Sequence, residues 1–144
     1  MKKKFEDYII GYKGSYTRKI TQRDNDLFAE LSGDYNPLHS QDDVAKEVGF
    51  KKRVSNGLVT ESRLAAALVQ TFGLGDCIVL ELEKNTLFRR PVYIGDNITA
   101  TVEVIERMNS MRILKIKAKC FNQNDEKVIE TSMLIQVLSR KGKI

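Results

Sequence analysis

From Cys77 onward, apolar residues recur at every second position, and this spacing limits the second half of the chain to β-strands. Ile78, Leu80 and Leu82 begin one long strand that Leu87 and Phe88 continue. A strand with this alternation buries one face and leaves the other in water, which is typical of an antiparallel sheet covered on one side. The second half therefore predicts a sheet that needs a partner layer.

Three further strands follow the first one. A turn at Pro91–Asp96 and another at Asn124–Asp125 separate them, and Lys115, Lys117 and Lys119 form a solvent-facing row in the strand between these turns. The apolar positions of the three strands are Ile98, Ala100, Val102 and Val104; Met111, Ile113 and Ile116; and Val128, Ile129, Met133, Ile135 and Val137. We expect all four strands to pair as one antiparallel sheet.

The first half supplies the layer that covers this sheet. The segment Gly57–Phe72 carries a wide apolar stripe at helical spacing, which predicts a long helix that is buried on most sides. Tyr12–Ile20 reads as a first strand. Together these elements predict an α+β domain, with one long helix packed on a curled antiparallel sheet.

Two shorter helices are expected between the first strand and the long helix. Thr21 and Asp24 form a capping-box pattern that opens a helix ending at Gly33. Ser40 and Asp43 repeat this pattern before a short helix that stops near residue 49. We expect Ser40 to cap this second helix.

The size of the chain and its cysteines exclude several classes of protein. The 144 residues suit one domain spanning positions 1–144. The longest apolar stretch, Leu64–Val69, is far shorter than the ~20 residues that cross a bilayer, and Glu6 and Asp7 stand where a signal peptide needs an apolar core. We therefore expect a cytoplasmic protein without membrane contact. Cys77 and Cys120 lack metal-ligand spacing, so no metal site is expected.

The net charge of +5 does not by itself predict a nucleic-acid partner, because no aromatic residues are interleaved with the basic ones. The basic runs are Lys2–Lys4, Lys51–Arg53, Arg89–Arg90, the Lys115, Lys117 and Lys119 row, and Arg140–Lys143. Most of them suit a solvated surface. Lys51–Arg53 has a second interpretation, since it precedes the long helix and its charges suit phosphates of coenzyme A or an acidic carrier protein.

Reactive side chains are concentrated in one segment, residues 31–39. Asp34 precedes the only histidine, His39, by five positions, and Pro37 keeps Asn36 out of the helical region. A bent loop between Asp34 and His39 can turn both side chains toward one point, where a carboxylate and an imidazole can hold a water and move a proton. Taken singly, Asp34 suits an ordinary turn residue and His39 a surface residue.

The complete string Phe28–His39, with Ala45 beyond it, resembles the hydratase signature of the MaoC-like family, which includes the (R)-specific enoyl-CoA hydratases. The likeness continues in the segment Phe50–Gly57 and in the turn formed by Phe88, Pro91–Val92 and Gly95–Asp96. The resemblance implies a hot-dog fold and a homodimer. It also implies an acyl-thioester substrate on coenzyme A or acyl carrier protein, with no separate cofactor.

The resemblance also implies roles for individual residues. Asp34 and His39 would be the catalytic pair, and Asn36 would help to position the water. Gly57 would offer its backbone N–H to the thioester oxygen at the start of the long helix, where the helix dipole favours negative charge. The family has histidine before this glycine, whereas this chain has Asn56. We expect Asn56 to alter loop contacts without removing the chemistry.

Three functions are compatible with these residues. The first is reversible hydration of a trans-2-enoyl thioester to the (R)-3-hydroxyacyl thioester. The second is thioester hydrolysis by a water that a carboxylate activates. The third is an acyl-thioester-binding module without catalysis. The intact pair of Asp34 and His39 favours hydration, whereas Asn56 slightly favours the binding module.

Overall fold

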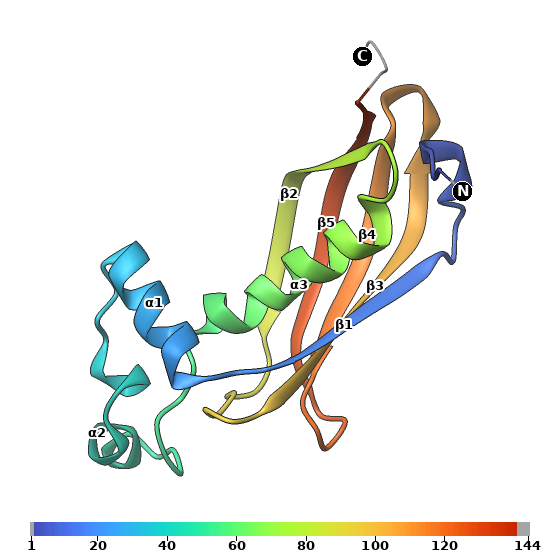
Figure 1. Cartoon of the computed structure of the whole chain (residues 1–144). Helices are drawn as coiled ribbons and strands as arrows, with labels where there is room; N and C mark the ends of the chain where they lie inside the picture. Colours follow the sequence, from blue (N-terminus) through green and yellow to red (C-terminus); the bar gives the residue numbers. More distant parts are fainter. Residues whose placement is uncertain (1, 141–144) are drawn as a thin grey trace.

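The computed structural model describes residues 2–140, and five antiparallel strands form its single sheet in the order β1-β3-β4-β5-β2. Figure 1 shows this sheet as one curved layer. The strands are β1 (Lys13–Lys19), β2 (Cys77–Phe88), β3 (Asn97–Met108), β4 (Ile113–Phe121) and β5 (Lys127–Ser139). The expected first strand and the four expected later strands are all present. Lys141–Lys143 of the last basic run lie outside the described residues.

Helix α3 (Gly57–Phe72) lies across one face of the sheet, as Figure 1 shows. Its inward side chains, including Leu64, Leu68 and Phe72, are almost completely buried against sheet residues such as Ile98 and Ile116. The α+β arrangement and both ends of this helix are as the sequence predicts. Burial of these side chains provides the main favourable contribution to folding, at roughly 25 cal/mol per Å² of apolar surface.

Two helices and a 3₁₀ turn gather at the N-terminal end of α3, away from the sheet (Figure 1). They are α1 (Gln22–Ser32), η2 (Pro37–His39) and α2 (Asp42–Glu47). Thr21 caps α1 by accepting from the Asp24 N–H, and Gly33 ends it with a φ of 79°, both as expected. The short turns η1 (Phe5–Asp7) and η3 (Asn109–Met111) complete the described elements.

The expected cap of α2 is wrong. The helix begins after Gln41, whose side chain makes no capping hydrogen bond. Ser40 instead closes the preceding 3₁₀ turn, since its N–H donates to the Pro37 carbonyl at 3.1 Å. Ser40 has a ψ of −15°, whereas a residue that caps the start of a helix typically has an extended backbone.

The two edges of the sheet differ in character. β1 is a short edge strand of mostly polar residues, whereas β2 is a long edge strand with exposed apolar side chains. Ile78, Leu80, Leu82, Leu87 and Phe88 are each at least 42% exposed. An exposed, apolar edge strand is a surface that normally needs covering.

The helices between residues 2 and 140 include none with the length and apolar character that a membrane crossing requires.

Candidate active site

The segment from Gly33 to His39 bends sharply, as its composition predicts. Asn36 Oδ1 accepts a hydrogen bond from the Leu38 N–H at 3.2 Å, and Pro37 starts the 3₁₀ turn that carries His39. Asn36 thus shapes the loop through its side chain. The bend brings Asp34 and His39 to the wall of one small cavity of about 250 Å³, which Asn36 also lines.

Two hydrogen bonds hold the carboxylate of Asp34. Its Oδ1 accepts from the Asn36 N–H at 3.1 Å, and its Oδ2 accepts from Asn56 Nδ2 at 2.9 Å. Both donors fix the orientation of the carboxylate. Each oxygen keeps a further lone pair, with which it can accept a hydrogen from a water molecule.

The imidazole of His39 is held through one nitrogen. Nδ1 lies 2.7 Å from the backbone carbonyl of Val54. Because a carbonyl oxygen only accepts, this contact places a proton on Nδ1. In the neutral ring Nε2 is then without a proton, and it is the atom that can take a proton from water and return it.

Asp34 and His39 are therefore anchored to the same short stretch of chain, residues 54–56, which leads directly into α3. Val54 donates its N–H to the Leu38 carbonyl at 3.1 Å, and Ser55 donates to the Val92 carbonyl at 2.7 Å. These backbone bonds connect the stretch both to the reactive loop and to the sheet side of the molecule. The reactive loop and the start of α3 consequently form one rigid unit.

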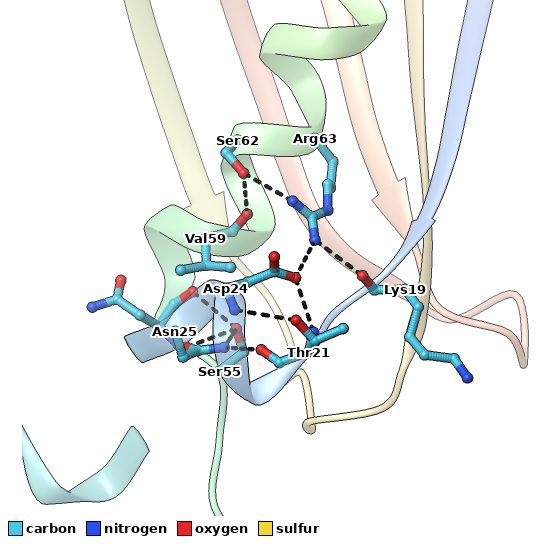
Figure 2. Close-up of polar contacts among 9 residues, drawn as sticks. Lys19, Thr21, Asp24, Asn25, Ser55, Val59, Ser62 and Arg63 are labelled. Atoms are coloured by element: carbon cyan, nitrogen blue, oxygen red, sulfur yellow. Dashed lines mark hydrogen bonds and ion pairs between the residues drawn. The ribbon is translucent and has the colours of Figure 1, made fainter. Parts of the chain in front are cut away.

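Asn25 of α1 adds a buried connection to the same stretch, and Figure 2 shows it beside Ser55. Its Oδ1 accepts from the Asn56 N–H at 2.8 Å, and its side-chain amide bonds the hydroxyl of Ser55 and the carbonyl of Thr21. Asn25 is only 4% exposed. A buried amide with all these partners fixes the angle at which α1 meets the start of α3.

The N-terminus of α3 presents a free backbone donor. Asn56 is the N-cap, and its Oδ1 accepts from the Leu58 N–H at 2.9 Å. Within residues 2–140 the N–H of Gly57 meets no acceptor, so it is available to a ligand. A Cβ at position 57 would lie 2.6 Å from the ring of Phe88, which explains why this position holds glycine.

A larger cavity of about 550 Å³ opens beside Gly57. Its walls include Val54, Gly57, Thr60, Phe88, Val92 and Ile129. Thr60 is 1% exposed, and its Oγ1 has no hydrogen-bond partner in the described part of the chain. Asn56 lines both cavities, so the larger, mainly apolar space adjoins the small cavity of Asp34 and His39.

A partly buried ion pair docks α1 onto α3, as Figure 2 shows. Arg63 donates to Asp24 Oδ2 at 2.8 Å and to the Lys19 carbonyl at 3.0 Å. Burial acts to raise the pKa of Asp24, but the hydrogen bonds from Thr21 and Arg63 outweigh it, and the pKa is lowered overall. The pair holds the helix that leads into the reactive loop.

In the basic run Lys51–Arg53, Arg53 is bound within the protein, whereas Lys51 and Lys52 lie at the surface. Arg53 is bound to Asp42 at 3.0 Å and to Gln22 at 3.1 Å, so it is part of the scaffold. Lys52 donates to the Ile94 carbonyl at 3.1 Å, and Lys51 is exposed. Lys51 and Lys52 share a surface depression with Arg90, which also lines the larger cavity.

Sequence reasoning missed three buried polar residues of this region: Asn25, Glu61 and Arg63. Their residue types are typical of a protein surface. No periodicity distinguishes them from exposed positions, and only their partners in the fold account for their burial.

The chain is similar to proteins of one known family. The model of the MaoC like domain matches residues 11–127. A 3-hydroxybutyryl-CoA dehydratase of Methylorubrum extorquens is 31% identical over 92% of this chain and 83% of its own length. An (R)-specific enoyl-CoA hydratase of Rhodospirillum rubrum is 32% identical over 81% of this chain and 79% of its own.

Solved structures give the same result. An R-hydratase of Pseudomonas aeruginosa superposes with a TM-score of 0.81 at 28% identity, covering 97% of this chain and 91% of the other. The sheet with its central helix is thus the hot-dog fold that the resemblance implies. On the match of the domain model and the identity of full-length relatives, the chain belongs to the MaoC-like family of hydratases and dehydratases.

Proposed function

We propose that this protein hydrates trans-2-enoyl thioesters reversibly to (R)-3-hydroxyacyl thioesters. One observation carries the proposal: Asp34 and His39 are both hydrogen-bonded to residues 54–56, immediately before the free N–H of Gly57. An acid–base pair and an oxyanion donor thereby occur on one rigid unit. The names of the relatives support the same reaction class.

In the proposed reaction the water lies between the Asp34 carboxylate and Nε2 of His39. The pair removes one proton from the water as its oxygen bonds to the β-carbon. The electrons of the double bond move toward the thioester carbonyl and form an enolate. The pair then returns the proton to the α-carbon on the same face, so that every atom of water is found in the product.

The enolate oxygen would be stabilised by the N–H of Gly57. The start of α3 carries a partial positive charge, and a preorganised donor there strengthens as negative charge develops. The apolar wall of the larger cavity would receive the acyl chain. The Arg90 side of that cavity would face the coenzyme A or acyl carrier protein part of the substrate.

A hydration assay tests the proposal. We expect loss of the enoyl absorbance of crotonyl-CoA and formation of the (R) product, identified by chiral analysis. Release of free coenzyme A would instead identify a thioesterase. Saturable binding of crotonyl-CoA without any turnover would identify a binding module.

We also propose that the protein works as a homodimer. The long apolar edge strand β2 and exposed apolar side chains of α3, such as Leu58 and Val69, support a self-complementary contact surface.

A further inference from the structure

The contact between α3 and the edge strand β2 contains a strongly polar layer made of Glu61, Lys84, Thr86 and Thr131, in which the Lys84 side chain is 27% exposed. Glu61 belongs to α3, and its side chain is only 10% exposed. Its Oε1 accepts from the Thr86 hydroxyl at 2.7 Å and lies 3.4 Å from Lys84 Nζ. Thr86 and Thr131 share a further hydrogen bond of 3.0 Å. This polar layer takes no part in the proposed reaction.

The polar layer lies directly beyond the wall of the larger cavity. In the β2–β5 ladder, Phe88 pairs with Ile129, and both line the cavity. Thr86 pairs with Thr131 two positions further along, and strand side chains two positions apart share a face. The two threonines are therefore the next residues on the same surface.

The geometry of helix α3 also places the polar layer just beyond Gly57. Glu61 follows Gly57 by four positions, so it lies on the same side of the helix, one turn further on. That turn corresponds to about 6 Å along the helix axis, at about 1.5 Å per residue. This is roughly the length of four carbon–carbon bonds of about 1.5 Å each.

An acyl chain that starts at Gly57 and runs along α3 would therefore meet the polar layer after a few carbons. Further methylene groups would press against a carboxylate that is already nearly desolvated and is held by the Thr86 hydroxyl and Lys84. Separating such a group from its partners without replacing them is strongly unfavourable. The barrier is thus chemical as well as steric.

We infer that this polar layer closes the acyl site and makes Glu61 a specificity-determining residue that restricts the enzyme to short enoyl thioesters. The inference rests on the proposed function, since it concerns the acyl end of that substrate. It concerns chain length only, and it is separate from the roles of Asp34 and His39.

The test measures kcat/KM for enoyl-CoA substrates of four, six, eight and ten carbons. In the unmodified protein we expect kcat/KM to fall at least ~10-fold between the four-carbon and the eight-carbon substrate, within the range for a few methylenes at a closed pocket. In the double variant Glu61→Ala with Thr86→Val, kcat/KM for the eight-carbon substrate should rise. The ratio of kcat/KM for the four-carbon substrate to that for the eight-carbon substrate should therefore fall by at least ~10-fold.

Glu81→Gln is the matched control. Glu81 binds the same Lys84 at 3.4 Å, but its side chain is 43% exposed. We expect this variant to keep the chain-length profile of the unmodified protein.

A binding experiment on the unmodified protein makes the test independent of whether the double variant folds. Saturated butanoyl-CoA and octanoyl-CoA are compared as inhibitors of crotonyl-CoA hydration, and we expect butanoyl-CoA to inhibit more strongly. Equal or rising kcat/KM for the longer enoyl chains, or stronger inhibition by octanoyl-CoA, would overturn the inference and leave the proposed hydration intact. Absence of hydration with every enoyl substrate would overturn the proposed function itself.

Discussion

At the scale of single residues, Asn56 performs two tasks with one side chain. Its Oδ1 caps α3 through the Leu58 N–H, and its Nδ2 donates to Asp34. The sequence predicts a hydrogen-bonding residue here that alters loop contacts, and the structure identifies those contacts. Asn56 thus couples the start of the helix to the carboxylate of the reactive loop.

Replacing either member of the reactive pair should stop catalysis without unfolding the protein. We expect Asp34→Asn and His39→Gln each to reduce hydration of crotonyl-CoA by at least ~10²-fold, the lower range for loss of a positioned acid or base. Asp26→Asn is the control, because Asp26 lines the same small cavity and its Oδ1 accepts a hydrogen bond from Gln22 at 2.9 Å. Wild-type turnover in either test variant would contradict the assignment of the pair.

The two tasks of Asn56 can be separated by substitution. Asn56→Ser keeps a good helix cap, so we expect the free energy of unfolding to change by only about 0.5 kcal/mol. Serine is too short to reach Asp34, and kcat should fall roughly 10-fold to 100-fold as the carboxylate loses its orientation. Asn56→Ala should show the same loss of kcat and a further loss of about 1 kcal/mol in stability. A Ser variant with full kcat would show that the Asp34 contact is dispensable.

Asp34, Asn36, His39 and Gly57 could be predicted as candidates because the residues around them resemble the motif of the MaoC-like family. Residue identity alone could not predict Asn25 or Arg63. Both are polar residues on helices, where exposure is the ordinary expectation, and both are buried because of partners more than 25 positions away in the chain. Side-chain chemistry is local information, whereas burial depends on the whole fold.

At the scale of elements, an ion pair joins α1 to α3 in addition to the hydrogen bonds of Asn25. Arg63 and Asp24 are 9% and 20% exposed at their side chains. Removing one member of such a pair leaves the other buried without its partner. The position of α1, and therefore of the reactive loop after it, depends on this contact.

Loss of the Asp24 carboxylate should destabilise the protein in a pH-dependent way. The folded state lowers the pKa of Asp24, so its stabilisation is complete above the unfolded pKa of about 3.9 and is lost as the pH falls through the folded value. We expect Asp24→Asn to reduce the free energy of unfolding by about 3 kcal/mol at pH 7. The difference in free energy of unfolding between the variant and the wild type should become smaller below about pH 4.

Urea unfolding at pH 7 and at pH 3 provides the measurement. Asp42→Asn serves as the comparison, since Arg53 also lowers the pKa of Asp42 but that carboxylate is on the surface. Asp42→Asn should change the free energy of unfolding clearly less than Asp24→Asn does at pH 7 and at pH 3. An equal loss for Asp24→Asn at both pH values would contradict the electrostatic account.

The elements that the sequence predicts best are those with strong local signals at both ends. α3 begins at the Asn56–Gly57 cap and ends before Gly73, and both signals are visible in the sequence. The predicted start of α2 is wrong because Ser40 belongs to the preceding 3₁₀ turn. The hydrogen bond from the Ser40 N–H to the Pro37 carbonyl places it there, and this bond depends on the bend of the whole loop. The spacing of Leu27 and Leu31 places them on one face of α1, as in a helix that buries an apolar stripe, yet they are 52% and 84% exposed.

At the scale of the whole molecule, the exposed apolar residues form a pattern. Many of them lie on β2, on α3 and on α1, and others, such as Ile9, Ile10 and Met111, lie elsewhere, whereas the edge strand β1 is itself mostly polar. The apolar character of β2 suits association through that edge of the sheet.

A light-scattering experiment tests this association. We expect a mass of twice the 16.4 kDa of one chain. Leu80→Lys combined with Leu82→Lys places charges on the apolar edge and should shift the mass toward that of one chain. Ser15→Lys, on the other edge strand, should leave the mass unchanged. A mass near 16.4 kDa for the unmodified protein over a wide concentration range would contradict the homodimer.

The pairing of β1 with β3 has a consequence for how this protein is made. The hydroxyls of Thr17 and Thr99 bond at 2.8 Å although 82 positions separate them in the chain. During synthesis at about 5–20 residues per second, the first strand must therefore wait on the order of ten seconds for β3, its neighbour in the sheet, to emerge. In that interval its polar residues keep it soluble, whereas the apolar strands appear late and close together, and can pair soon after they leave the ribosome.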